Sequence, residues 1–144
     1  MYLLDTNLLL RSVDTSSAMY LEAVGAIQKL QANDNRLHIV PQNLIEFWNV
    51  YTRPIERNGL GKSALEAQME CDRLKQIFPL LLDNEAIYPI WEALVVRYGV
   101  IGVNVHDARL VAAMQVHGLT HLLTFNISDF RRYAEITAIA PSEV

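Results

Sequence analysis

The stretch Tyr2-Leu3-Leu4-Asp5-Thr6-Asn7 decides the fold, because an apolar run stops there at three polar residues. A short continuous apolar run predicts a strand that is buried on both faces, as in a parallel sheet. The same pattern occurs in Leu37 to Val40, which stops at Pro41, and in His121 to Thr124. A fourth strand, at the edge of the sheet, is predicted over residues 136–139.

Between these runs the apolar residues recur at helical spacing, which predicts helices that alternate with the strands. The expected helices are one that ends before Asn33-Asp34-Asn35, Pro41 to Arg53, Ser63 to about Phe78, Ile87 to Tyr98 before Gly99, and Asn104 to His117 before Gly118. This alternation predicts an α/β protein in three layers, with a mainly parallel sheet of four to five strands and helices on both faces. No repeat or linker divides the chain, so we expect a single domain over residues 1–144.

The composition is typical of a folded protein of the cell interior. Hydrophobic residues make up 51% of the 144 residues and charged residues 19%, which is too apolar for a disordered chain. The single cysteine, Cys71, permits no internal disulfide, and no run approaches the roughly 20 apolar residues of a membrane span. We therefore expect a soluble, cytoplasmic protein. Its formal charge of −4 excludes a DNA-coating protein, but not an enzyme that handles nucleic acid through metal ions.

Four acidic residues lie where the predicted strands end or where the following helices begin. They are Asp5, Glu46, Asp107 and Asp129. Each has a structural explanation when taken alone, such as a turn, a helix cap or an exposed helix position. Parallel strands end at one edge of a sheet, where ligands bind in open α/β folds, so the four carboxylates are expected to share a cleft. Such a cluster favours bound divalent cations, and oxygen ligands suit Mg²⁺ or Mn²⁺, one or two of which can promote phosphodiester hydrolysis.

Four blocks of sequence resemble the ordered motifs of PIN-domain ribonucleases, and most of all those of VapC-type toxins of bacterial toxin–antitoxin pairs. The blocks are Leu3 to Asn7, Leu44-Ile45-Glu46-Phe47, His106-Asp107-Ala108 and Leu123 to Phe130. The likeness covers essentially the whole chain. It implies a PIN-like fold and an Mg²⁺-dependent endoribonuclease, with Mn²⁺ as a possible substitute, that cuts RNA such as tRNA or ribosomal RNA by metal-activated water. It also implies an antitoxin protein as partner, and a homodimer.

The resemblance assigns roles position by position. The family's three firmest acidic positions fall on Asp5, Glu46 and Asp107. Its supporting polar positions fall on Thr6, Asn7 and Thr124. Many relatives have a fourth acid where this chain has Asn126, and the nearest acid, Asp129, comes one helical turn later. Asn126 is thus expected to support the site and Asp129 to act as an outer metal ligand or to orient water, while the number of metal ions stays open.

Basic residues near the expected cleft are candidates for binding RNA phosphates. They are Arg53, Arg57 and Arg131, and the alternative for each is ordinary solvated surface. Two other functions remain open. One is a PIN-like module that has lost catalysis through Asn126 and only binds RNA or protein. The other is a phosphoryl-transfer or receiver-type domain in which Asp5 accepts a phosphoryl group.

Overall fold

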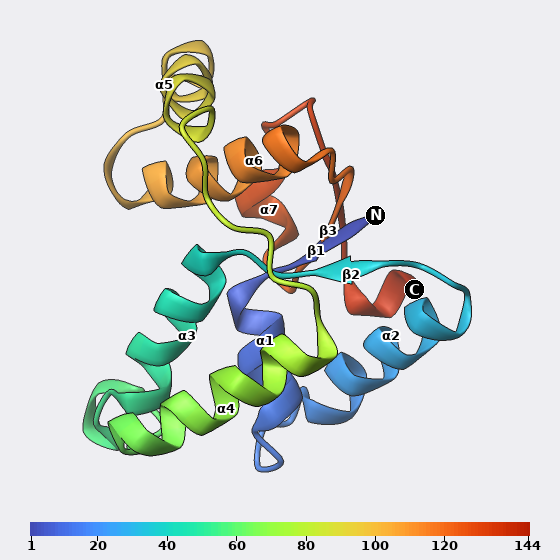
Figure 1. The fold of residues 1–144 in the computed structure, drawn as a ribbon, viewed down its shortest axis with the longest axis vertical. Helices are drawn as coiled ribbons and strands as arrows, with labels where there is room; N and C mark the ends of the chain where they lie inside the picture. Colours follow the sequence, from blue (N-terminus) through green and yellow to red (C-terminus); the bar gives the residue numbers. More distant parts are fainter.

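Four short parallel strands form the central sheet of the computed structural model, which describes all 144 residues (Figure 1). They are β1 (Tyr2–Leu4), β2 (Leu37–His38), β3 (His121–Leu123) and β4 (Thr137–Ile139), in the order β2-β1-β3-β4. Each neighbouring pair is parallel. The predicted α/β class, with its parallel sheet and helical layers, is confirmed.

Seven α-helices connect the strands. They are α1 (Thr6–Val13), α2 (Tyr20–Ala32), α3 (Pro41–Thr52), α4 (Ala64–Ile77), α5 (Ile87–Tyr98), α6 (Val105–His117) and α7 (Ile127–Phe130). The predicted helix ends are confirmed at Ser63, whose Oγ accepts a hydrogen bond from Glu66 N, and at Gly99 and Gly118, which adopt the left-handed conformation after α5 and α6. None of these helices is both long and apolar enough to cross a bilayer.

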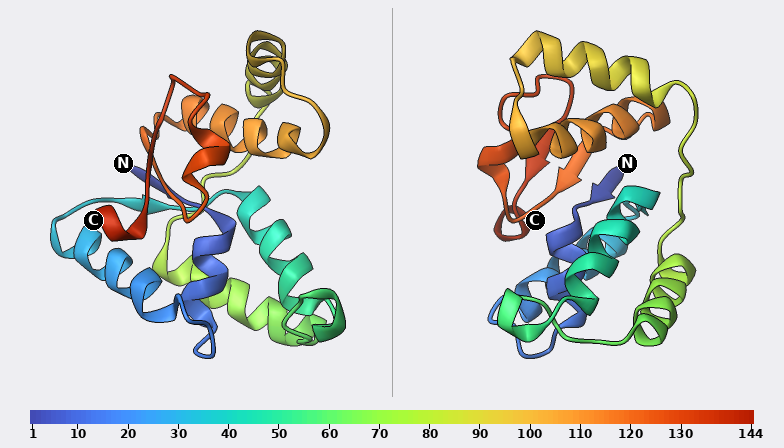
Figure 2. Two further views of the ribbon diagram at one scale, coloured as in Figure 1. Left: turned by 180° about the vertical axis from the view of Figure 1, so that it is seen from behind. Right: turned by 90° about the vertical axis from the view of Figure 1, so that its left-hand side faces the viewer.

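The alternation of side chains along the strands divides the core into two halves. Leu3 of β1 and Leu122 of β3 are partners in the sheet and pack with α5 and α6 on one face. Leu4 and Leu123 pack with α1 to α4 on the other face. All four leucines are fully buried. Figures 1 and 2 show this division, with α5 and α6 on one side of the strands and α1 to α4 on the other.

Two local predictions are wrong. The sequence predicts no helix directly after the first strand, but α1 begins at Thr6 immediately after β1. The Asp5 side chain caps this helix by accepting a hydrogen bond from Thr6 N, so no loop is needed. The strand expected to reach Val40 ends at His38, and Ile39 instead forms an isolated parallel bridge with Leu80.

Candidate active site

Asp5 lies where the carboxyl ends of the two central strands meet. Its N–H donates to the carbonyl of Leu123, the last residue of β3, over 3.0 Å. Its carboxylate accepts two hydrogen bonds, one at Oδ1 from Thr6 N over 2.8 Å and one at Oδ2 from the Thr124 hydroxyl over 2.6 Å. Asp5, Thr6 and Thr124 are all buried. The orientation of this carboxylate is therefore fixed by its neighbours.

The four predicted acids come from four parts of the chain and line one pocket of about 280 Å³. Asp5 follows β1, Glu46 lies on α3, Asp107 lies in the first turn of α6, and Asp129 lies on α7. The remaining lining residues are Thr6, Asn7, Leu10, Asn49, Val50, Asn126 and Phe130. Thr124 lies beside the pocket through its bond to Asp5. The structure thus brings every predicted metal-site and supporting residue to one place.

Burial, together with the charges of neighbouring acids, raises the pKa of Asp5 and of Asp107 to about 6, from an ordinary value of 3.8. For Asp5, burial is the main cause, opposed by the bonds from Thr124 and Thr6, and the charges of Glu46 and Asp129 add to it. For Asp107, burial is again the main cause, followed by the charges of Asp5, Asp129 and Glu46. Carboxylates that are buried beside other negative charges in this way favour a bound cation.

Glu46 is half-buried, and both of its carboxylate oxygens accept hydrogen bonds. Oε2 accepts from the Thr6 hydroxyl over 3.2 Å, and Oε1 accepts from Gln42 Nε2 over 2.6 Å. The Thr6 hydroxyl in turn accepts from Asn43 Nδ2 over 3.4 Å. These contacts direct the Glu46 side chain from α3 toward the residues that follow β1.

The donor atoms in the pocket fit a hard divalent cation. Carboxylate and amide oxygens are the ligands that Mg²⁺ and Mn²⁺ prefer. Oδ1 of Asn7 is buried and has no hydrogen-bond partner, as expected of an oxygen that awaits a ligand. No three His, Cys, Asp or Glu side chains lie close enough as they stand to hold one ion together.

Asn126 and Asp129, the two candidates for the fourth position, both line the pocket and are both exposed. They are linked through the backbone, where Asp129 N donates to the carbonyl of Asn126 over 3.1 Å. The backbone N–H of Asn126 donates to the Thr124 hydroxyl over 2.9 Å, which anchors this segment to the group that holds Asp5. The backbone that carries Asn126 and Asp129 is therefore held in place, and both side chains lie at the pocket.

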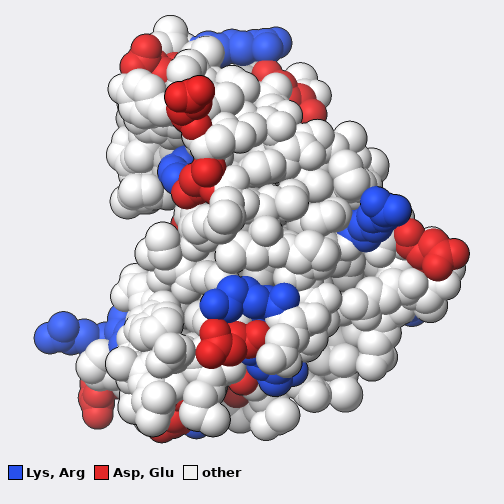
Figure 3. All heavy atoms as spheres, in the orientation of Figure 1, with Lys and Arg blue, Asp and Glu red and all other residues white.

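The three predicted phosphate-binding arginines do not line the acidic pocket. Arg53 follows the last turn of α3, seven residues after Glu46 and so on nearly the same face of the helix. Arg57 and Arg131 are exposed, in the loop after α3 and directly after α7. Lys and Arg are scattered among Asp and Glu on the face drawn in Figure 3, around a hollow between the upper and lower parts of the molecule. Arg132, which follows Arg131, lowers the pKa of Asp107 and so lies close to the acids.

Sequence reasoning missed four polar residues around Glu46, which are Gln42, Asn43, Asn49 and Arg109. Gln42 and Asn43 are buried in the first turn of α3, and Asn43 Oδ1 accepts a hydrogen bond from Val40 N over 2.9 Å. Two adjacent amides in the first turn of α3 were the available signal. Their partners come from α1 and α6, which are distant in the sequence.

Comparisons with known proteins agree with this fold. A family model described as PIN domain matches residues 2–136. Among solved structures, VapBC2 from Rickettsia felis bound to a promoter DNA fragment superposes with a TM-score of 0.71 at 17% identity, over 96% of this chain and 97% of that one. A toxin–antitoxin complex from Klebsiella pneumoniae gives 0.67 at 22% identity over all of both chains. VapC20 from Mycobacterium tuberculosis, a toxin that cleaves the sarcin-ricin loop, gives 0.61 at 17% identity over 85% and 87%. No curated protein matches the sequence.

Proposed function

Since the chain belongs to the PIN-domain family, we propose that it is an endoribonuclease that depends on a divalent cation, and that it is the toxin of a toxin–antitoxin pair. The observation that carries this proposal is the pocket that Asp5, Glu46, Asp107 and Asp129 line together. Burial and the charges of neighbouring acids, which together raise the pKa of Asp5 and of Asp107, support a cation as the natural ligand.

In this proposal Asp5, Glu46 and Asp107 hold Mg²⁺, or Mn²⁺ in its place. The bound ion would act as a Lewis acid toward the attacking water and the scissile phosphate. Thr6 and Thr124 keep Asp5 oriented, and Asn7 contributes its unpartnered Oδ1. A carboxylate oxygen of the exposed Asp129 accepts a proton from the water that attacks phosphorus. The P–O3′ bond then breaks and O3′ takes up a proton from solvent water, which leaves a 5′-phosphate and a 3′-hydroxyl.

We propose that the RNA backbone reaches the pocket past basic side chains on its rim. Arg53, which directly follows α3, and Arg57 in the following loop would contact phosphates on one side, and Arg131 on the other. Such contacts hold the strand in register without reading its sequence. A structured RNA such as tRNA or ribosomal RNA is the proposed substrate, and the cytoplasm is therefore the proposed site of action.

The proposed protein partner is an antitoxin, in keeping with the toxin–antitoxin complex from Klebsiella pneumoniae that shares this fold. A homodimer is proposed as well. Large apolar side chains on α4 and α5 are more than 60% exposed, namely Leu65, Met69, Tyr88 and Val96. Apolar surface of this kind is typical of a face that a partner covers.

The decisive test is cleavage of an RNA pool with Mg²⁺ or Mn²⁺, with EDTA, and by the Asp5→Asn variant. We expect cleavage only with metal, and a loss of at least about 100-fold in Asp5→Asn. The matched control is Asp72→Asn on the exposed face of α4, which should cleave as the wild type does. Cleavage that survives both EDTA and the Asp5 substitution would refute the proposal.

A second candidate function is a PIN-like module that binds RNA or protein without cleaving RNA. One observation favours it: no three acidic side chains are yet close enough to share an ion. This alternative predicts that calorimetry detects no Mg²⁺ binding while RNA affinity is retained. The proposed nuclease requires binding of the metal, so a single titration distinguishes the two.

A further inference from the structure

Glu46 and Asp107 reach the acidic pocket from helices that belong to different halves of the core. Phe47, next to Glu46 on α3, is buried in the half formed by α1 to α4. Ala108, next to Asp107 on α6, is buried in the half that contains α5. Packing within either half alone therefore does not fix the distance between these two carboxylates, which also depends on direct contact between α3 and α6.

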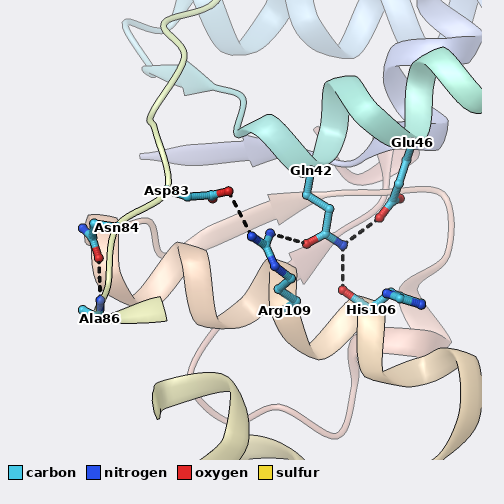
Figure 4. A network of polar contacts seen from close by, with 7 residues as sticks. All are labelled: Gln42, Glu46, Asp83, Asn84, Ala86, His106 and Arg109. Atoms are coloured by element: carbon cyan, nitrogen blue, oxygen red, sulfur yellow. Dashed lines mark hydrogen bonds and ion pairs between the residues drawn. The ribbon is translucent and has the colours of Figure 1, made fainter. Parts of the chain in front are cut away.

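The Gln42 side chain makes that contact. It is only 7% exposed, and its Nε2 donates two hydrogen bonds. One goes to Oε1 of Glu46 over 2.6 Å, and the other goes to the carbonyl of His106 over 2.8 Å. His106 directly precedes Asp107, so one amide group joins Glu46 to the turn of α6 that carries Asp107. Figure 4 shows Gln42 pointing from α3 toward α6 between these partners.

The orientation of the Gln42 amide is itself fixed. Its Oε1 accepts a hydrogen bond from Arg109 NH1 over 3.0 Å, and Arg109 NH2 donates to Asp83 over 2.9 Å. A flipped amide would place Oε1 against the Glu46 carboxylate and the His106 carbonyl, which offer no proton. It would also turn the NH₂ group toward the Arg109 guanidinium. The series of hydrogen bonds that runs from Asp83 to Glu46 thus has a single arrangement of donors and acceptors (Figure 4).

We propose that Gln42 is a positioning residue that sets the relative placement of Glu46 and Asp107 for metal binding, with Arg109 holding it in place. This inference rests on the proposed metal-dependent function. Because Gln42 holds Oε1 of Glu46 and Thr6 holds Oε2, the Glu46 side chain has little freedom left to lose when it ligates an ion. Replacing a partner that orients a metal ligand typically lowers metal affinity by 10- to 100-fold.

The test is calorimetric titration of the protein with Mn²⁺ alone, without RNA. Gln42→Met keeps the length of the side chain and removes all three hydrogen bonds. We expect its Mn²⁺ affinity to fall by at least about 10-fold. Gln115→Met, at an exposed position of α6, is the matched control and should bind as the wild type does. RNA cleavage by Gln42→Met should recover at saturating Mn²⁺, whereas a general loss of structure would not be corrected by metal.

Arg109→Met provides a second variant, because its position is only partly buried. It should lower Mn²⁺ affinity less than Gln42→Met does. The double variant should be no worse than Gln42→Met, because both changes break one chain of contacts. Additive losses, or wild-type affinity in Gln42→Met, would overturn the inference while leaving the nuclease proposal standing. Absence of Mn²⁺ binding by the wild-type protein would overturn both.

Discussion

The hydroxyl of Thr124 donates to Oδ2 of Asp5 over 2.6 Å, although 119 residues separate the two in the sequence. The same hydroxyl oxygen accepts from the backbone N–H of Asn126 over 2.9 Å. One buried side chain therefore orients the first acid of the pocket and anchors the segment that leads to Asp129. The end of β3 supports the end of β1 at the floor of the site.

Thr124→Val tests this support. The change keeps the shape of the side chain but removes the donor to Asp5, which further raises the pKa of Asp5 and frees its carboxylate. We expect Mn²⁺ affinity to fall by about 10-fold and the free energy of unfolding to fall by about 1 kcal/mol. Calorimetry and urea unfolding measure the two effects. Thr137→Val on β4, an exposed position, is the control, and equal effects in both variants would contradict the role given to Thr124.

Metal affinity should depend on pH through Asp5 and Asp107, whose pKa values are both about 6. The ion binds the deprotonated carboxylates, so protons compete with it below that pH. Mn²⁺ affinity should therefore be highest above about pH 7 and fall steeply as the pH drops through 6. Titrations at several pH values between 5 and 8 check this. A constant affinity over that range would show that neither carboxylate ligates the metal.

The same pKa values predict how pH affects the stability of the metal-free protein. A carboxyl whose pKa is higher in the folded state than in the unfolded state stabilises the fold when protonated. That stabilisation is complete below about 3.8 and is lost as the pH rises through about 6. In EDTA, these two groups should make the free energy of unfolding larger at pH 5 than at pH 7. Urea unfolding at the two pH values measures the difference, and the opposite sign would contradict the account.

Asp107→Asn should stabilise the metal-free protein at pH 7, because it removes a charge that burial and the neighbouring acids Asp5, Asp129 and Glu46 disfavour. We expect a gain on the order of 1 kcal/mol, the usual size when a strained functional group is replaced. Mg²⁺ should stabilise the wild type by mass action and leave the variant unaffected. Thermal unfolding with and without Mg²⁺ measures both. If the variant were less stable than the wild type in EDTA, Asp107 would be a residue that stabilises the folded protein, contrary to this account.

Replacing Arg53 and Arg57 with Gln should weaken RNA binding and reduce its dependence on salt. Each lost phosphate contact should lower the slope of log affinity against log salt by about 1. Binding is measured in an Asp107→Asn background, so that the RNA stays intact. Arg36→Gln is the control, since Arg36 precedes β2 and lies at the opposite edge of the sheet. An unchanged salt dependence in the double variant would show that these arginines do not contact RNA phosphates.

The sequence predicted the strands and the meeting of the four acids well, because both depend on local signals and on one rule of parallel sheets. Asp5 comes directly after an apolar run, so its place at the sheet edge follows from the pattern of residues alone. Helix α1 was missed because the polar residues that begin it are equally typical of a turn. Gln42 and Arg109 were missed because their roles arise only when α3 and α6 face each other.

The central claim is that the acids of one pocket bind the ion that promotes RNA cleavage. The most direct measurement compares the Mn²⁺ dependence of RNA cleavage with Mn²⁺ binding by calorimetry, for the wild type, Asp107→Asn and the control Asp72→Asn. We predict that the wild type and Asp72→Asn reach half of their maximal rate at the metal concentration that half-fills the site, and that Asp107→Asn loses both binding and cleavage. The account would be contradicted if Asp107→Asn cleaved RNA in EDTA at the rate that the wild type reaches with Mn²⁺.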